Sequence, residues 1–206
     1  MPRKLFIPSL ILAAAVAIFF AGNTIYQIYG DSTPTIYRGS TSINSTDSPP
    51  PPASPEPNCP YQEEKRAVRG DSLSGLIENG ATVKILFNYY KCRDPQRGDI
   101  IAYHYAAKTD PIIKIVKGVP GDTLGLKTQN GKWLILLNGE IVKNSKGEEY
   151  EIDGSGERML SLYIKDYKGV IPEGAYLLLG NLKNGSLDST RFGLVGKEDI
   201  LGKVEQ

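Results

Sequence analysis

The sequence has 206 residues and is almost balanced in charge, with 24 Lys and Arg against 23 Asp and Glu. A surface that binds nucleic acid usually carries a clear basic excess, so this balance argues against nucleic acid as a partner. Hydrophobic residues make up 40% of the chain. At this length, that content predicts one compact domain with accessory segments.

The first accessory segment is an uncharged, apolar run over residues 5–28. A helix needs about 20 apolar residues to cross a bilayer, so the run is long enough to be a transmembrane anchor. Arg3 and Lys4 precede it, which predicts a single-pass protein of the cell membrane with residues 1–4 in the cytoplasm. The alternative is a cleaved secretory signal, although the run exceeds the usual apolar core of one. Either way, the body of the protein is extracytoplasmic.

The second accessory segment covers residues 29–60 and is rich in Ser, Thr and Pro. Of the 14 prolines in the chain, seven lie between Pro49 and Pro60. Such a segment cannot bury a core, and its composition predicts a semi-stiff spacer. The folded domain is therefore expected over residues 61–206.

Two cysteines, Cys59 and Cys92, both follow the predicted anchor. An extracytoplasmic compartment permits disulfides, so we expect Cys59 to pair with Cys92; two free thiols are the alternative. Two thiols and a single histidine argue against a metal site. No other cofactor is indicated by the sequence.

The folded domain is expected to be mainly β, with antiparallel strands and few helices. Short runs of β-branched, aromatic and leucine residues alternate with turn signals, and no stretch sustains a 3.6-residue apolar period. The Asn138-Gly139 pair predicts a hairpin. The predicted strands are residues 83–87, 99–105, 112–116, 133–137, 160–164, 175–179 and 200–204.

A candidate nucleophile lies in the segment at residues 70–80, which reads GDSLSGLIENG. Ser72 and Ser74 lie between glycines, where the chain should turn sharply and expose side chains. A Ser-His-Asp arrangement would require His104, the single histidine, as the base. His104 alternates with apolar neighbours and is more simply interpreted as a half-buried strand residue.

A lysine can replace histidine as the base if its amine is neutral, and burial among apolar groups favours the neutral form. Lys114 has such a setting, because isoleucine and valine flank it in the segment PIIKIVKGVPGD. From composition alone, an outward-facing lysine on a half-buried strand is the simpler interpretation. The residues around Lys114 give a second reason to interpret it as the base.

Four segments, in order along the chain, resemble those of type I signal peptidases, serine peptidase family S26. VRGDSLSGLIENGATV is similar to the nucleophile segment, with Ser72 as the nucleophile and Gly80 as its closing glycine. RGDII at residues 97–101 is similar to the family's Arg-Gly-Asp strand, and KIVKGVPGD places the general base on Lys114. The closing segment matches at Gly180, Ser186, Asp188, Ser189, Gly193, Val195, Gly202 and Lys203.

The sequence also departs from the family pattern at the nucleophile turn. Leu73, Gly75 and Leu76 stand where Met, Pro and Thr are usual. Leu73 keeps the apolar character, whereas Gly75 is expected to loosen a turn that proline would stiffen.

Charged positions of the family pattern differ as well. Residues 181–183 read Asn-Leu-Lys in place of Asp-Asn-Arg, and Ile115 follows the lysine where arginine is usual. Thr190 replaces a second arginine, with Arg191 one place late. Loss of both arginines together avoids an unpaired charge. We expect a divergent branch in which Asp188 either pairs with Arg191 or remains solvated.

The resemblance implies the antiparallel, barrel-like β fold of signal peptidases, a LexA-like peptidase fold, with residues 122–175 as an inserted β subregion. It implies a membrane-anchored endopeptidase that removes signal peptides from secreted preproteins. In that reading Ser72 attacks and Lys114 is the base. Ser186, two residues before Asp188 in the closing segment, orients the lysine amine.

The resemblance also implies an extended substrate that adds backbone hydrogen bonds along strand edges. The Ser72 backbone N–H would be one donor to the oxyanion. The partners implied are secreted preproteins and the lipid bilayer. The residues expected to bind substrate are Val68, Arg69, Gly70, Leu73, Ile112 and Ile113.

Three other functions are compatible with parts of the sequence. A self-cleaving repressor would need a DNA-binding helical module where this chain has a predicted anchor and spacer. A peptidase that processes pilins or acts in conjugation shares both chemistry and location, and only its substrates would distinguish it. A non-catalytic, surface-binding β domain is the non-enzyme alternative, against which the presence of both Ser72 and Lys114 argues.

Overall fold

The structure, a computed structural model, describes residues 60–105 and 110–206. The predicted anchor and all of the predicted spacer but Pro60 lie outside these residues. Among the described residues, no helix is long and apolar enough to cross a bilayer. Cys59 is also outside, so its pairing with Cys92 stays a prediction; no cysteine within the described part is free.

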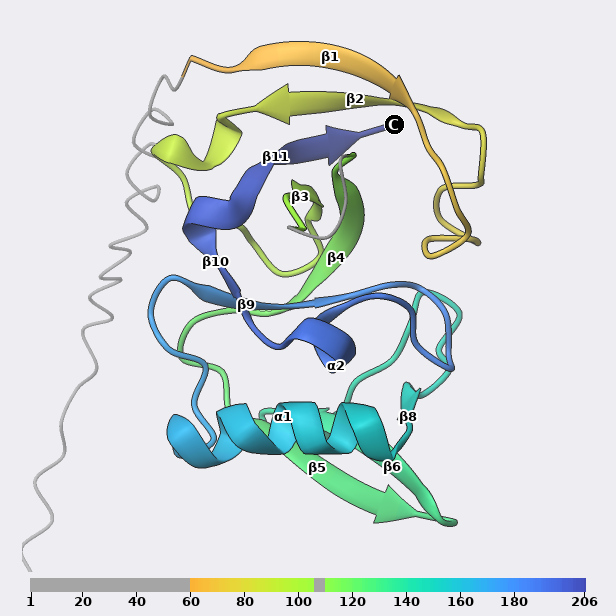
Figure 1. Cartoon of the computed structure of the whole chain (residues 1–206), viewed down its shortest axis with the longest axis vertical. Helices are drawn as coiled ribbons and strands as arrows, with labels where there is room; N and C mark the ends of the chain where they lie inside the picture. The colour runs from red at the N-terminus through yellow and green to blue at the C-terminus, as the bar shows by residue number, and fades with distance from the viewer. Residues whose placement is uncertain (1–59, 106–109) are drawn as a thin grey trace, which may run out of the picture. The chain divides into compact units, whose positions relative to one another are not determined.

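The larger of two sheets has seven strands in the order β1-β2-β11-β3-β4-β9-β10 (Figure 1). Every neighbouring pair in it is antiparallel. Two short 3₁₀ helices, η1 (Tyr89–Lys91) and η2 (Lys197–Asp199), precede β3 and β11 in the chain. The strands are β1 (Gln62–Ala67), β2 (Thr82–Phe87), β3 (Ile100–Tyr103), β4 (Ile112–Gly118), β9 (Ala175–Leu179), β10 (Val195–Gly196) and β11 (Ile200–Glu205).

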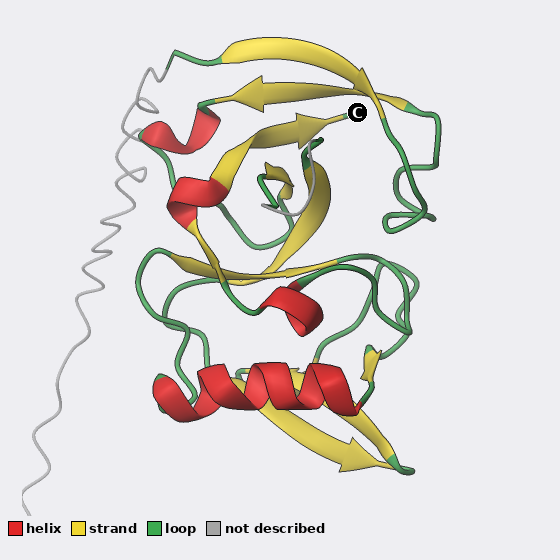
Figure 2. Cartoon of the chain, in the orientation of Figure 1, coloured by secondary structure: helices red, strands yellow, loops and turns green. Residues whose placement is uncertain are grey.

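The smaller sheet follows β4 in the chain and precedes β9. Its strands are β5 (Leu124–Gln129), β6 (Lys132–Leu137), β7 (Glu140–Ile141) and β8 (Glu151–Ile152), all antiparallel to their partners. Helix α1 (Gly154–Asp166) packs against this sheet, and the short α2 (Ser189–Phe192) lies beside α1 (Figure 2). These elements from β5 to α1 lie within residues 122–175, the predicted inserted subregion, which is thus not purely β.

The prediction of a mainly β, antiparallel domain is confirmed, and so is the hairpin at Asn138-Gly139, where Leu137 pairs with Glu140. The strand predicted at residues 160–164 is wrong, because these residues belong to α1. Gly154 and Gly156 in the first helical turns are poor helix formers, which hid the helix from propensity. The start is fixed instead by Asp153, whose carboxylate accepts hydrogen bonds from two backbone N–H groups of the first turn.

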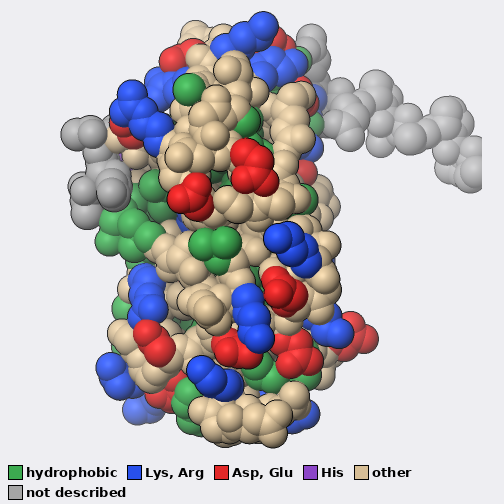
Figure 3. Space-filling model, turned by 90° about the vertical axis from the view of Figure 1, so that its right-hand side faces the viewer, with side chains coloured by type: hydrophobic (Ala, Val, Ile, Leu, Met, Phe, Trp, Pro, Cys, Tyr) green, Lys and Arg blue, Asp and Glu red, His purple; other side chains and the backbone are tan. Residues whose placement is uncertain are grey.

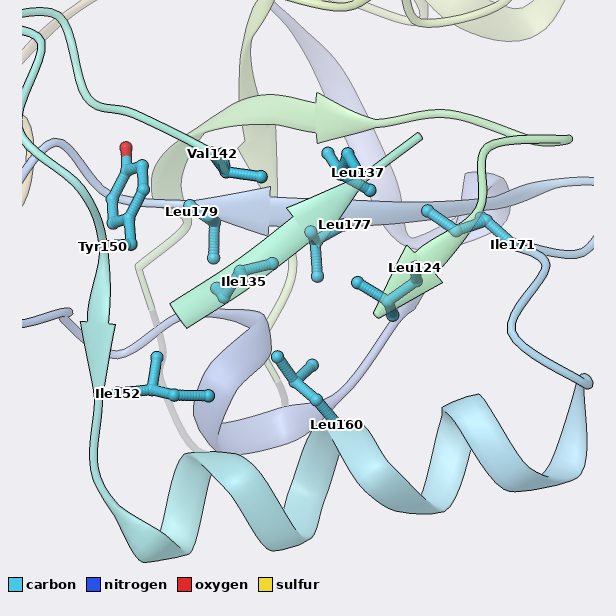
Figure 4. Close-up of a cluster of buried hydrophobic side chains, with 10 residues drawn as sticks. All are labelled: Leu124, Ile135, Leu137, Val142, Tyr150, Ile152, Leu160, Ile171, Leu177 and Leu179. Atoms are coloured by element: carbon cyan, nitrogen blue, oxygen red, sulfur yellow. The ribbon is translucent and has the colours of Figure 1, made fainter. Parts of the chain in front are cut away.

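Strand β9 belongs to two hydrophobic cores because its side chains alternate between its two faces. Leu177 and Leu179 pack in a cluster with residues of the smaller sheet and Leu160 of α1, as Figure 4 shows. Tyr176 and Leu178 pack on the opposite face with residues of β3, β4 and β10. Because both faces of β9 are buried, this strand joins the core of the smaller sheet to the larger sheet, where β9 lies next to β4.

Two of the segments that resemble the family meet in an ion pair. Arg97 Nη2 donates to both carboxylate oxygens of Asp122 at 2.6 Å. Asp122 is buried and also accepts from the Val119 backbone N–H and from Asn138 Nδ2, each at 2.8 Å. The Arg-Gly-Asp strand and the Pro-Gly-Asp turn are thus joined where the chain passes from one sheet to the other.

Replacement of Asp122 by Asn should lower the free energy of unfolding at pH 7 by about 2 kcal/mol, the scale of hydrogen bonds to a charged group. Burial alone would raise the pKa of Asp122, but the bonds from Val119, Arg97 and Asn138 outweigh it and lower this pKa. The stabilisation is therefore present above the ordinary aspartate pKa and is lost as pH falls through the lower, folded-state value. Denaturant unfolding of wild type and variant should show their difference shrinking below about pH 4.

The exposed Asp110 offers the matched control, since its contact with Arg69 is at the surface. Asp110→Asn should change stability far less than Asp122→Asn. Equal effects of the two substitutions, or a difference that does not respond to acid, would contradict the role given to Asp122.

Candidate active site

Ser72 lies on a turn that two buried side chains hold in place. Leu73 and Ile77 are 1% and 2% exposed and pack in one core cluster, so the chain between them must arch over that cluster. The Ile77 N–H donates to Leu73 O at 2.9 Å, and the Ser74 N–H donates to Asp71 O at 3.0 Å. Leu73 is therefore a packing residue under the turn, and Ser72 remains half-buried above it.

Gly75 adopts φ +88°, a left-handed value that proline cannot take and most residues avoid. A Cβ at this position would come within 2.9 Å of the Lys146 side chain. The glycine thus suits this turn in two ways, by its backbone conformation and by the close approach of Lys146. The expectation that Gly75 merely loosens a proline-type turn was incomplete.

The Lys114 amine lies against the Ser72 hydroxyl. Its Nζ is 2.7 Å from Ser72 Oγ and donates to Ile113 O at 2.8 Å. Lys114 comes from β4 and is 3% exposed. The structure therefore brings together the two predicted dyad residues, which are 42 positions apart in the sequence.

Burial lowers the pKa of Lys114 from 10.5 to about 8, and the negative charge of Asp188 opposes this shift. With that pKa, roughly a tenth of the amine is neutral at pH 7, against well under a thousandth for an exposed lysine. A neutral amine that gives one N–H to Ile113 O keeps its lone pair for the Ser72 hydroxyl proton. Such a pair of hydroxyl and amine can act as nucleophile and base.

Asp188 is fully buried, and neutral donors satisfy its carboxylate. Oδ2 accepts from the Gly180 N–H at 3.1 Å, and from the N–H and hydroxyl of Ser186 at 3.2 and 2.8 Å. Oδ1 accepts from the N–H and hydroxyl of Thr190 at 3.1 and 2.7 Å. Both expectations for Asp188, a pair with Arg191 or a solvated carboxylate, are therefore wrong.

Arg191 instead pairs with Asp153, through two hydrogen bonds of 2.9 and 2.8 Å. This bidentate contact holds the pKa of Asp153 down, at about 2. Because Asp153 caps the N-terminus of α1, Arg191 ties α2 to that helix end. Arg191, which stands one position later than the arginine of the family pattern, thus pairs with Asp153 and not with a residue beside Lys114.

The Ser186 hydroxyl donates to Asp188 Oδ2, and no hydrogen bond joins Ser186 to Lys114 within the described residues. The acceptor that orients the amine here is Ile113 O, which sequence reasoning missed. Ser186 still lies close to the nucleophile segment, because both approach Gly180. A Cβ added at Gly180 would lie 2.7 Å from Ser72 O and even nearer to Ser186 Oγ.

A hollow of about 270 Å³ opens beside the Ser72–Lys114 contact. The predicted substrate residues Val68, Arg69, Ile112 and Ile113 line it, whereas Gly70 and the buried Leu73 do not. Sequence reasoning missed the other residues of the wall and rim, which come from β1, β2 and the two residues just before β4. They are Arg66, Ala67, Val83, Ile85, Asp110 and Pro111.

His104 is exposed and follows the end of β3, so its interpretation as a half-buried strand residue is wrong. The Lys114 amine contacts Ser72 and not Ser74. Among the described residues, no group of three or more His, Cys, Asp or Glu side chains is placed to hold a metal ion. On the face drawn in Figure 3, acidic and basic side chains are interspersed rather than gathered by sign.

A serine hydroxyl in contact with a buried lysine amine, beside a hollow, is typical of serine hydrolases that use lysine as the base. Comparison with known proteins agrees. The family model described as signal peptidase, peptidase S26, matches residues 59–206. The chain therefore belongs to the S26 signal peptidase family, and the protein is a serine-type hydrolase.

Individual relatives are similarly named. Signal peptidase IB of Staphylococcus aureus (strain Mu50 / ATCC 700699) is 30% identical over 146 residues, which is 66% of this chain and 73% of that protein. Signal peptidase I of Bacillus caldolyticus is 30% identical over 141 residues, 67% of this chain and 75% of that protein. A crystal structure of a signal peptidase I from Enterococcus faecalis V583 is 24% identical and covers 55% of this chain and 98% of its own, with a TM-score of 0.39.

Gly180→Ala should reduce hydrolytic activity strongly, because the new methyl group would push against Ser72 O and Ser186 Oγ. We expect about a hundredfold loss, the scale of a nucleophile displaced by about 1 Å. Peptide cleavage rates and circular dichroism would measure the loss and the retained fold. Gly125→Ala is the matched control, since its Cβ would meet nothing nearer than 3.7 Å; a Gly180→Ala variant as active as this control would disprove the close approach.

Proposed function

We propose that this protein is a membrane-anchored serine endopeptidase that removes signal peptides from secreted preproteins, with Ser72 as nucleophile and Lys114 as general base. Membership of the signal peptidase family supports the substrate class. The observation that carries the residue assignment is the 2.7 Å contact between the buried Lys114 amine and the Ser72 hydroxyl.

In the proposed reaction, the Ser72 oxygen attacks the scissile carbonyl while neutral Lys114 accepts the hydroxyl proton. The resulting ammonium gives that proton to the leaving amine when the peptide bond breaks, which leaves an acyl group on Ser72. Lys114, again neutral, then takes a proton from water as it attacks the ester. Release of the acid product and return of the proton to Ser72 Oγ complete the cycle.

The site offers a donor for the negative charge that develops on the carbonyl oxygen. Among the described residues, no group accepts a hydrogen bond from the Ser72 backbone N–H. A free N–H on the nucleophile itself can point at the oxyanion, and this supports its assignment as one oxyanion donor.

Unpaired backbone at the hollow supports binding of an extended substrate. Strand β4 pairs with β9 from Ile115 onward, but over Ile112–Lys114 its one partner in the described part of the chain is β3. Strand β1 pairs only with β2 among the described strands. A peptide strand between these two edges can form backbone hydrogen bonds and place its side chains in the hollow lined by Val68 and Ile113.

The sequence supports the proposed location. Residues 5–28 would anchor the chain in the cell membrane, with residues 1–4 in the cytoplasm and residues 29–60 as a spacer. The peptidase domain of residues 61–206 would then act on preproteins at the outer surface of the membrane. This arrangement brings the hollow to the side of the bilayer where translocated preproteins emerge.

Ser72→Ala and Lys114→Ala should each abolish cleavage of a precursor that carries a signal peptide, while both variants stay folded. The first removes the attacking oxygen, and the second removes the base. Ser74→Ala and His104→Ala should keep near wild-type rates, because neither side chain contacts the Lys114 amine. The rates can be measured by incubating each purified protein with the precursor of a secreted protein. Mass analysis of the products would give the site of cleavage.

The proposal would be wrong if Ser72→Ala cleaved normally or if His104→Ala were as damaging as Lys114→Ala. Cleavage of pilin-type precursors alone, with no action on ordinary secretory precursors, would instead favour the processing peptidase with the same chemistry.

The acid limb of the activity profile should report the lowered pKa of Lys114. Protonation removes the base, so kcat/KM should fall as pH drops through about 8 and level off above it. Rates measured between pH 6 and 10.5 on a substrate without titratable groups would define this limb. A profile that continues to rise to about pH 10 would indicate an ordinary lysine and contradict the effect of burial.

A further inference from the structure

Asn181 binds the turn that carries Ser72 at two points. The Asn181 backbone N–H donates to Ser72 O at 2.6 Å. Its side-chain Nδ2 donates to Ser74 O at 2.9 Å. Asn181 is 2% exposed, so both bonds lie away from bulk water. One residue thus holds two carbonyl groups of the same turn, one of them on Ser72 itself.

The side chain of Asn181 is itself fixed by the connection between β7 and β8. Ser145 N–H donates to Asn181 Oδ1 at 3.0 Å, and Asn181 Nδ2 donates to Ser145 Oγ at 2.8 Å. Asn144 Nδ2 donates to Asn181 O at 3.1 Å. Both hydrogens and the oxygen of the Asn181 amide are therefore used, which leaves the side chain one orientation.

Residues 144–148, which we call the support loop, are rigid enough to transmit this constraint. Asn144 Oδ1 accepts from the N–H groups of Lys146 and Glu148 at 2.9 Å each, and Asn144 Nδ2 donates to Glu148 Oε2 at 2.8 Å. Lys146 of this loop also packs over Gly75, the glycine of the Ser72 turn. The support loop therefore touches the turn directly at Gly75 and through Asn181.

We propose that Asn181 is a positioning residue that, together with the support loop, fixes the Ser72 hydroxyl at the Lys114 amine. The inference rests on the proposed role of Ser72 as nucleophile. Its physical basis is that a reacting oxygen displaced by about 1 Å costs on the order of a hundredfold in rate. The turn belongs to no helix or strand, so its position depends on its own few hydrogen bonds and on contacts such as those from Asn181.

The test uses the full-length purified protein and three single variants. Asn181→Ala removes the amide but keeps the backbone bond to Ser72 O. Ser145→Ala removes one partner of that amide at an exposed position, where folding is not at risk. Asn184→Ala is the matched control, an exposed asparagine three residues further along the same segment.

For Asn181→Ala we expect kcat on a signal-peptide precursor to fall ten- to a hundredfold, on the scale of a small displacement. KM should change less than threefold. The fall of kcat/KM on the acid side should stay at the same pH as in the wild type, because the surroundings of Lys114 are unchanged. Ser145→Ala should cause a smaller loss. The double variant should be no worse than Asn181→Ala, since Ser145 acts through Asn181.

A second readout does not depend on peptidase activity. Backbone hydrogen exchange of a peptide that covers residues 70–77 should be faster in Asn181→Ala than in wild type and Asn184→Ala, while exchange in β4 stays the same. If wild type failed to cleave precursors, the proposed function would be wrong, and exchange would still decide whether Asn181 holds the turn.

Three results would overturn the inference: unchanged kcat in folded Asn181→Ala, additive losses in the double variant, or unchanged exchange over residues 70–77. A loss of activity that merely follows a loss of folded protein would also overturn it. Only a fall in kcat for folded enzyme, with the pH limb in place, supports a positioning role.

Discussion

The contact between the Lys114 amine and the Ser72 hydroxyl depends on keeping water away from a lysine. Burial penalises the ammonium, and this penalty is what lowers the pKa of Lys114 to about 8. The surrounding fold must therefore exclude solvent on several sides at once. β3 and β4 supply one side, the turn over Leu73 supplies another, and the closing segment with the buried Asp188 supplies a third.

Asp188 shows how a negative charge can lie near the Lys114 amine without cancelling the effect of burial on the pKa of that amine. A free carboxylate beside Lys114 would favour the ammonium and so raise its pKa. Here five hydrogen bonds from Gly180, Ser186 and Thr190 hold the carboxylate in place, and burial of Lys114 remains the larger effect. The carboxylate serves to shape the closing segment, which carries Gly180 past Ser72.

Sequence alone predicted the strands well where apolar runs are bounded by clear turns, as at β4 and at the Asn138-Gly139 hairpin. It failed at α1, where glycines lower helix propensity and the signal is a single capping aspartate. The apolar flank of Lys114 made it a candidate base, but the choice of the Ser72–Lys114 pair depended on the resemblance of the surrounding residues to a family. The partners of Asn181 could not be predicted, since they lie in segments up to 107 residues away, joined through loops with no periodicity. Those of Asp188 lie within eight residues of it, but they come from irregular backbone whose course no apolar period fixes.

The departures from the family pattern become consistent once they are seen together in space. Ile115 and Thr190 stand where the resemblance leads one to expect arginines, and Asn181 stands where it leads one to expect an acid. A buried acid at 181 without an arginine nearby would be an uncompensated charge, which is costly. The neutral amide avoids that cost and, unlike a carboxylate, has N–H groups to donate to Ser74 O and Ser145 Oγ. With these charges absent, the pKa of Lys114 is set by burial and by Asp188. In place of the expected ion pairs, directed hydrogen bonds of Asn181 hold the Ser72 turn.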